Sequence, residues 1–151
     1  MTLKKILLPM VSLFLAATAA YAGGENWLTD YETAVEKAKK ENKLILIEFH
    51  GSDWCPPCIK LNKEILSTDS FKSLAEESLV LVDADFPRKT SLPEAQQNHN
   101  DQLAQKFGAR YFPTVLLVNA EGKVLDKMVG YPRGGLDGFL SFIKAQTASG
   151  S

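Results

Sequence analysis

The chain has 151 residues, the length of a single domain, and its 45% hydrophobic and 23% charged residues exclude a disordered or fibrous protein. Its formal net charge is −1, and its Lys and Arg residues are scattered rather than clustered. The composition therefore gives no indication of a nucleic-acid-binding surface.

Residues 1–22 have the three-part layout of a secretory signal peptide. Two early lysines precede an apolar core of residues 6–17, and an Ala-Tyr-Ala sequence ends at Ala22. The apolar core is shorter than the ~20 residues that span a bilayer, which favours a cleaved signal over a membrane anchor. We expect cleavage after Ala22, a mature domain of residues 23–151 in the periplasm or secreted, and no stable membrane insertion after cleavage.

The first half of the mature chain alternates helical and strand patterns. Helical spacing predicts a helix over residues 29–42, where Thr29 and Glu32 form a capping-box pattern. An almost continuous apolar run at residues 43–49 is typical of a parallel strand buried on both faces. Two further helices are predicted over residues 55–66 and 67–77.

The second half begins with another buried strand at residues 78–85. Residues 86–100 are polar and punctuated by prolines, which predicts a loop or surface insertion. The rest of the pattern predicts a helix over 100–108, a hairpin over 113–130 and a helix over 134–145 before a frayed tail. The order of elements indicates an α/β fold.

Cys55 and Cys58 are the two cysteines of the chain, and Pro56 and Pro57 separate them at the seam between a strand and a helix. A disulfide at this spacing closes a very short loop and removes little entropy from the unfolded chain, so a structural staple is disfavoured. A thiol at a helix N-terminus has a lowered pKa and is a good nucleophile, which favours a redox couple. Structural zinc takes four ligands; with His50 as a third ligand, a copper or zinc site remains the alternative.

The two prolines indicate the direction of the redox chemistry. Pro57 has no N–H, and neither Pro56 nor Pro57 offers a charge or a donor to a thiolate. Strong oxidants of this type owe their potential to a stabilised reduced form. We therefore expect a relatively reducing couple.

The Trp-Cys-Pro-Pro-Cys sequence of residues 54–58, together with Phe-Pro-Thr at residues 112–114, resembles thioredoxin over essentially the whole mature chain. The resemblance implies the thioredoxin fold, a central mixed β-sheet flanked by helices with the CxxC at a strand-to-helix seam. It also implies that Cys55 is the attacking thiol and Cys58 the resolving thiol.

The same resemblance implies a substrate site around Phe112 and Pro113. Pro113 would be the cis-proline that faces the cysteines, the backbone of Phe112 would pair with substrate, and Trp54 and Tyr111 would lie beside the site. An ordinary trans proline that begins a strand is the alternative for Pro113.

Glu48 is an acid within an apolar strand, where burial is costly unless the group has a partner or a role. Thioredoxins carry a buried carboxylate near this place, which handles the proton of the resolving cysteine, and the resemblance gives Glu48 that role. A Glu48 side chain that reaches the surface is the alternative. The loop before Trp54 is one residue longer than in thioredoxins, and Leu81 stands where they carry a lysine. His99 is expected to be a solvated loop residue.

The long segment of residues 86–102 resembles exported thioredoxin-like proteins and the C-terminal domains of membrane electron-transfer reductases. The resemblance implies an exported thiol–disulfide oxidoreductase that reduces protein disulfides, draws electrons from a membrane or soluble thiol donor, and works as a monomer without a metal or cofactor. The alternatives are a disulfide oxidase or isomerase, and a non-catalytic thioredoxin-like binding module or metal chaperone.

Overall fold

The computed structural model describes residues 26–148. The signal peptide predicted over residues 1–22 therefore lies outside the described residues. Within residues 26–148, none of the helices combines the length and the apolar character that crossing a membrane requires.

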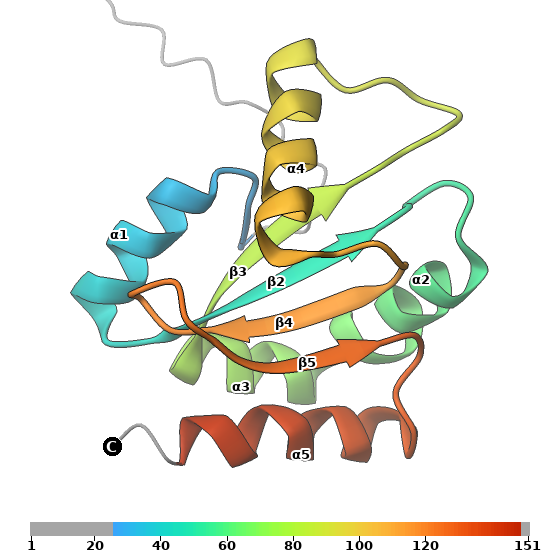
Figure 1. The fold of residues 1–151 in the computed structure, drawn as a ribbon. Helices are drawn as coiled ribbons and strands as arrows, with labels where there is room; N and C mark the ends of the chain where they lie inside the picture. The colour runs from blue at the N-terminus through green and yellow to red at the C-terminus, as the bar shows by residue number, and fades with distance from the viewer. Residues whose placement is uncertain (1–25, 149–151) are drawn as a thin grey trace, which may run out of the picture.

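A five-stranded mixed sheet forms the centre of the described domain (Figure 1). Its strands are β1 (Trp27–Leu28), β2 (Leu44–His50), β3 (Leu79–Asp85), β4 (Thr114–Val118) and β5 (Val124–Val129). They lie in the order β1-β3-β2-β4-β5. β3 pairs in parallel with β1 and β2, whereas β4 is antiparallel to both β2 and β5. The mixed sheet and the hairpin are confirmed; the short strand β1 was not predicted.

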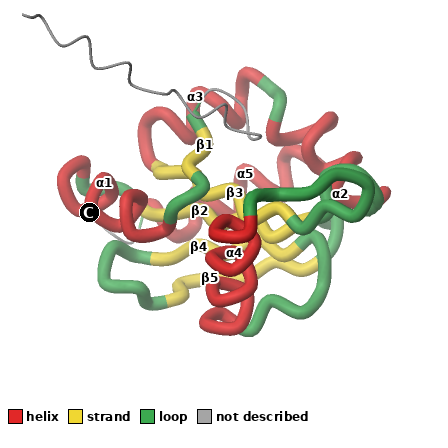
Figure 2. Tube along the Cα trace, turned by 90° about the horizontal axis from the view of Figure 1, so that it is seen from above, coloured by secondary structure: helices red, strands yellow, loops and turns green. Residues whose placement is uncertain are grey.

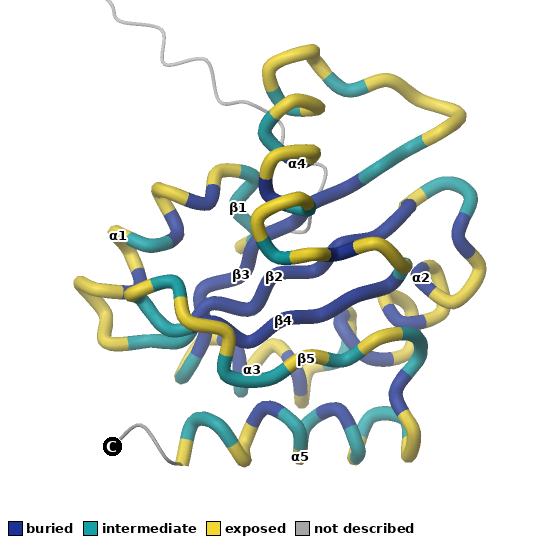
Figure 3. Tube along the Cα trace, in the orientation of Figure 1, coloured by how far each residue is buried: buried dark blue, intermediate teal, exposed yellow. Residues whose placement is uncertain are grey.

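Helices cover both faces of this sheet (Figures 1 and 2). They are α1 (Tyr31–Glu41), α2 (Pro56–Leu61), a π-helical turn η1 (Asn62–Leu66), α3 (Asp69–Ser78), α4 (Glu94–Phe107) and α5 (Gly135–Thr147). Buried side chains of α1 and α4 form one core with the sheet, and those of α2, η1, α3 and α5 form the other. The middle strands β3, β2 and β4 are buried along their length (Figure 3).

Successive side chains of β2 enter opposite cores, as the two-residue period of a strand requires. Ile47 and Phe49 face α1 and α4, whereas Leu46 packs with Leu61 of α2. Glu48 and His50 have the same parity as Leu46, and both are buried. The strand therefore directs an acid and a histidine to the face that α2 covers.

Two helix boundaries differ from the sequence prediction. The N-cap of α1 is Asp30 rather than Thr29, since an Asp30 carboxylate oxygen accepts a 2.7 Å hydrogen bond from the Thr33 amide. The helix predicted over residues 55–66 is divided into α2 and the π-helical turn. Both differences are local adjustments that leave Cys55 at the start of a helix.

The loop predicted over residues 86–100 is wrong in its second half, because α4 begins at Glu94. Few apolar residues mark this segment, and polar contacts attach it to the sheet instead. The Asn100 side-chain amide donates a 2.8 Å hydrogen bond to the Asp85 carbonyl. His99 is likewise helical and half-buried, and one of its ring nitrogens accepts a 3.2 Å hydrogen bond from the Tyr31 amide. α5 continues to Thr147, two residues into the expected tail.

Candidate functional site

Cys55 and Cys58 form a disulfide at the N-terminus of α2. Cys55 is the N-cap of the helix, and Pro56 and Pro57 occupy its first turn. Prolines suit this position because the first amides of a helix have no partner within it. The amides of Cys58 and Ile59 both donate to the Cys55 carbonyl, at 3.1 and 3.0 Å. Both cysteines are buried. Their arrangement is that of a redox pair whose disulfide can be reduced to two thiols and formed again.

An aromatic group lies next to the cysteine pair. The Trp54 and Phe112 rings meet edge to face, with centroids 6.0 Å apart, and Phe86 stacks on Phe112 at 5.0 Å. The Phe112–Pro113 peptide bond is cis, as the resemblance implies. Within residues 26–148 the Phe112 amide and carbonyl have no hydrogen-bond partner. This backbone is free to pair with an extended chain.

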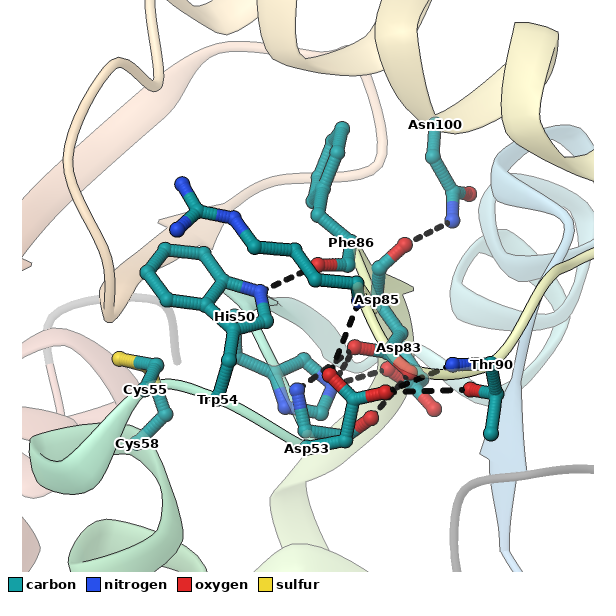
Figure 4. A network of polar contacts seen from close by, with 12 residues as sticks. His50, Asp53, Trp54, Cys55, Cys58, Asp83, Asp85, Phe86, Thr90 and Asn100 are labelled. Atoms are coloured by element: carbon teal, nitrogen blue, oxygen red, sulfur yellow. Dashed lines mark hydrogen bonds and ion pairs between the residues drawn. A yellow bond between two sulfur atoms is a disulfide. The ribbon is translucent and has the colours of Figure 1, made fainter.

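Trp54 is held by the loop that follows β3 (Figure 4). Its indole N–H donates a 2.7 Å hydrogen bond to the Phe86 carbonyl, and the Arg88 guanidinium lies 3.5 Å from the ring centre. The indole also rests on Gly51, where an added Cβ would clash with its ring atoms. A side chain at this position would displace the ring, so the glycine is required for the close approach.

Asp53 also holds the loop that follows β3 in place. Its carboxylate accepts hydrogen bonds from the amides of Arg88, Lys89 and Thr90, at 2.8 to 2.9 Å. These amides, with that of Arg88 foremost, hold the pKa of Asp53 below its ordinary value. The residues before the CxxC and the loop after β3 thus form one structural unit.

A buried cluster of charged side chains lies on the face of the sheet that α2 covers: Glu48, His50, Asp83 and Asp85. We call it the acid–histidine cluster. The parallel register places Glu48 opposite Asp83 and His50 opposite Asp85. His50 Nε2 is 2.6 Å from an Asp83 carboxylate oxygen and 3.9 Å from one of Asp85. Asp85 also accepts hydrogen bonds from the Ser52 amide and hydroxyl, at 2.9 and 2.6 Å.

Glu48 is buried within this cluster, and its Oε1 atom has no hydrogen-bond partner. The alternative in which Glu48 reaches the surface is therefore wrong. Burial raises the pKa of Glu48 to about 7. The His50 charge opposes that rise, whereas the carboxylates of Asp83 and Asp85 add to it.

For the pKa of His50, the neighbouring groups outweigh burial. Burial by itself lowers the pKa of an imidazole. The hydrogen bond to Asp83 and the surrounding negative charges outweigh burial and raise the pKa of His50 to about 9. At neutral pH the ring is therefore an imidazolium, held among carboxyl groups.

The structure joins Cys55 to Cys58 in a disulfide and places the rings of Trp54 and Phe112 together. Glu48 lies with His50 in the acid–histidine cluster, and the Tyr111 side chain is largely exposed. Sequence reasoning missed Asp83 and Asp85. Their signal was present, since they are the acids of a strand that is otherwise apolar, at the same two-residue spacing as Glu48 and His50. It also missed Arg88, which lies beyond the strand in a polar loop.

The copper or zinc site that the sequence left as an alternative would use Cys55, Cys58 and His50 as ligands. In the structure the two cysteines form a disulfide, and His50 forms a hydrogen bond with Asp83. Across residues 26–148, the group of three potential ligands whose atoms lie together is Asp30, Glu32 and His99. That group includes neither cysteine.

The same arrangement of sheet, helices and cysteines occurs in a known family. The family model described as a thioredoxin-like domain matches residues 31–142. The chain belongs to the thioredoxin-like family. With its CxxC disulfide, it is a thiol–disulfide oxidoreductase.

Two relatives from Chlamydia pneumoniae match it in sequence. The disulfide bond reductase DsbH is 38% identical over 115 residues, which cover 76% of this chain and 69% of DsbH. The thioredoxin-related protein DsbJ is 30% identical over 95 residues, and the match covers 63% of this chain but only 27% of DsbJ. A solved structure described as DsbH oxidoreductase has 37% identity and a TM-score of 0.73, over 81% of this chain and 83% of that one.

Proposed function

We propose that this protein reduces protein disulfides outside the cytoplasm. The observation that carries the direction is the position of Cys55 as the N-cap of a helix whose next two residues are prolines. The dipole and free amides of a helix N-terminus favour a thiolate. Prolines withhold part of that stabilisation, which makes the dithiol a better reductant. The similarity to a disulfide bond reductase supports the same direction.

The cycle begins when the Cys55 thiolate attacks a substrate disulfide, forms a mixed disulfide and releases the first substrate thiolate. The Cys58 thiol then gives its proton to the Glu48 carboxylate, and the Cys58 thiolate attacks the Cys55 sulfur. The Cys55–Cys58 bond forms, the bond from Cys55 to the substrate breaks, and the second substrate thiolate leaves. Two electrons pass to the substrate, and a membrane-bound or soluble protein dithiol restores the reduced protein.

Substrate lies across Trp54, Phe112 and Pro113 in this proposal. The unpaired backbone groups of Phe112 support pairing with an extended substrate segment, the main-chain recognition that sheet edges use. The partners are therefore disulfide-bonded proteins that can present their disulfide in an extended segment. The protein works as a monomer.

Reduction of insulin by dithiothreitol tests the activity. The protein is expected to accelerate precipitation of the insulin B chain, and Cys55→Ser is expected to abolish the acceleration. Cys58→Ser should accumulate a mixed disulfide with substrate. In the reduced wild type at neutral pH, Cys55 should alkylate faster than Cys58. Equal alkylation rates, or a wild type as inactive as Cys55→Ser, would contradict the proposal.

Export is the second part of the proposal, and it rests on the signal-peptide pattern of residues 1–22. The full chain expressed in a bacterium with a periplasm is expected to yield a soluble periplasmic product that begins at Gly23. Mass spectrometry of the intact periplasmic protein measures the cleavage position. A product that keeps residues 1–22 and stays in the cytoplasm would contradict export.

A further inference from the structure

The acid–histidine cluster has an unusual distribution of charge for a buried site. It contains three carboxyl groups and one imidazole, and none of the four residues is more than 8% exposed. Three carboxylates beside a single imidazolium would leave a buried excess of negative charge, which is unfavourable. A proton retained on one carboxyl group reduces this buried excess from two negative charges to one.

Hydrogen bonding decides which carboxyl group keeps that proton. Asp83 accepts from His50 at 2.6 Å, and the Nε2 atom must carry the hydrogen because a carboxylate only accepts. Asp85 accepts from the Ser52 amide and hydroxyl. Glu48 Oε1 has no donor. Both aspartates thus have hydrogen-bond donors, which Glu48 Oε1 lacks, and Glu48 is the carboxyl group whose pKa burial raises.

His50 carries the positive charge that acts on Glu48. It lies two residues from Glu48 on the same face of β2, and its ring is fixed by Asp83. Its charge favours ionisation of Glu48, while the charges of Asp83 and Asp85 oppose it. The protonation of Glu48 therefore depends on whether His50 is charged.

We propose that His50, fixed by Asp83, is the buried counter-charge that allows Glu48 to ionise, and so is a positioning residue for the resolving step. This inference rests on the proposed role of Glu48 as the proton acceptor of Cys58. His50 touches neither substrate nor the reacting sulfurs in this scheme. It acts through Glu48.

The chemical step itself is unchanged by this role. The Cys58 proton moves to the Glu48 carboxylate, the Cys58 thiolate forms the bond to Cys55, and substrate leaves as a thiolate with the electron pair of the broken bond. His50 keeps its proton throughout. Its charge sets the fraction of molecules in which Glu48 is ionised and able to accept.

The groups that can influence this equilibrium are few. β3 contributes Asp83 and Asp85. Cys55, the N-cap of α2, and Cys58 within α2 do not titrate while they are bonded. β4 places Val115 opposite Glu48 and adds no charge there. The preceding loop contributes Ser52, which is neutral. In the oxidised protein, His50 and the two aspartates are therefore the charges that Glu48 experiences.

Carbon-13 NMR of the side-chain carboxyl groups in the oxidised protein tests the inference without any redox step. In the wild type, Glu48 is expected to titrate near pH 7, while nitrogen-15 shifts show that His50 stays protonated to about pH 9. His50→Gln keeps a donor for Asp83 and removes the charge. It should move the Glu48 titration up by about one pH unit or more. His99→Gln, the same change at the other histidine, should leave it unmoved.

Single-turnover kinetics then connect the titration to the resolving step. Decay of the mixed disulfide, trapped by rapid alkylation, is measured from about pH 5.5 to 9, a range that brackets the Glu48 titration. With His50→Gln the rising limb should move to higher pH, which makes decay about tenfold slower at about pH 6.5, while the rate at high pH approaches that of the wild type. A rate lowered equally at every pH would show a merely structural role and overturn the inference.

The wild type keeps the inference testable if His50→Gln does not fold. Should Glu48 ionise only after His50 has lost its proton, His50 is not its counter-charge. The result of this test can be distinguished from a failure of the proposed reductase function. Failure to reduce insulin would contradict the reductase proposal, whereas a Glu48 titration that ignores His50 would contradict this inference alone.

Discussion

The guanidinium of Arg88 lies 3.5 Å from the centre of the Trp54 ring, and Trp54 immediately precedes Cys55. This pair joins the loop after β3 to the rim of the cysteine site. Within residues 26–148, no acidic side chain forms an ion pair with Arg88. A cation without an acidic partner therefore lies on the surface that we assign to substrate.

Arg88→Gln should change which substrates are reduced fastest. An exposed charge pair with substrate contributes modestly, so kcat/KM for a peptide disulfide flanked by acidic residues should fall about two- to fivefold. For a peptide flanked by basic residues it should not fall. Lys89→Gln is the matched control, since this neighbouring cation makes no contact with Trp54, and it should leave the preference unchanged. The preference should also weaken at high salt.

Asp53→Ala should release the loop after β3. Three amides, of Arg88, Lys89 and Thr90, lose their common acceptor. Their hydrogen exchange should accelerate by about an order of magnitude relative to the wild type, and Trp54 fluorescence should change as its contacts loosen. Asp101→Ala, an exposed acid of α4, serves as the control and should alter neither reading. Unchanged exchange of the three amides would show that other contacts hold the loop.

The oxidised protein should become less stable as pH rises from about 5 to 9. The raised pKa of Glu48 makes the folded state hold a proton that the unfolded state releases above about pH 4.5, so stability falls until pH passes about 7. The raised pKa of His50 gives stability that is complete below about pH 6.5 and is lost as pH rises through about 9.

Both effects have the same sign, and each unit of pKa difference corresponds to about 1.4 kcal/mol. Urea unfolding of the oxidised protein at about pH 5, 7 and 9 measures the trend. His50→Gln should flatten it above about pH 8, once the raised Glu48 titration of this variant is passed. Greater stability at the alkaline end of this range than at the acid end would mean that Glu48 and His50 do not hold their extra protons in the folded state.

Pro57→His should raise the redox potential. A histidine between the cysteines restores an amide and adds a donor that stabilises the thiolate, and about 30 mV corresponds to about 1.4 kcal/mol for this two-electron couple. One hydrogen bond to a charged group contributes about 1.5–3 kcal/mol, so the shift should be several tens of millivolts. Pro93→His, at the exposed N-cap of α4, should leave the potential unchanged.

The wild type is expected to lie nearer about −270 mV, the thioredoxin value, than about −120 mV, that of a strong oxidant. Equilibration with glutathione buffers measures both proteins. A wild-type potential above about −180 mV, the isomerase value, would favour the oxidase or isomerase alternative.

Local patterns in the sequence determined the elements and the redox pair. The apolar runs of β2 and β3 predict buried parallel strands, and Cys55 and Cys58 are adjacent on one helical turn whatever the rest of the fold does. Gly108 ends α4 in a left-handed conformation, as its sequence position predicts. These features depend on neighbours a few residues apart, so periodicity and turn chemistry are sufficient to predict them.

The tertiary structure alone decided which charges meet. Asp83 and Asp85 are more than thirty residues from His50 in sequence, and only the parallel register of β2 and β3 places them against it and Glu48. A shift of that register by one residue would turn the aspartates to the opposite face. The start of α4 was similarly undetermined, because its first turns carry no apolar stripe and reach β3 through the buried Asn100 amide, whereas the buried Leu103 lies further along the helix. Contacts between distant segments leave no periodic pattern in either segment, which is why the acid–histidine cluster emerged only in the folded chain.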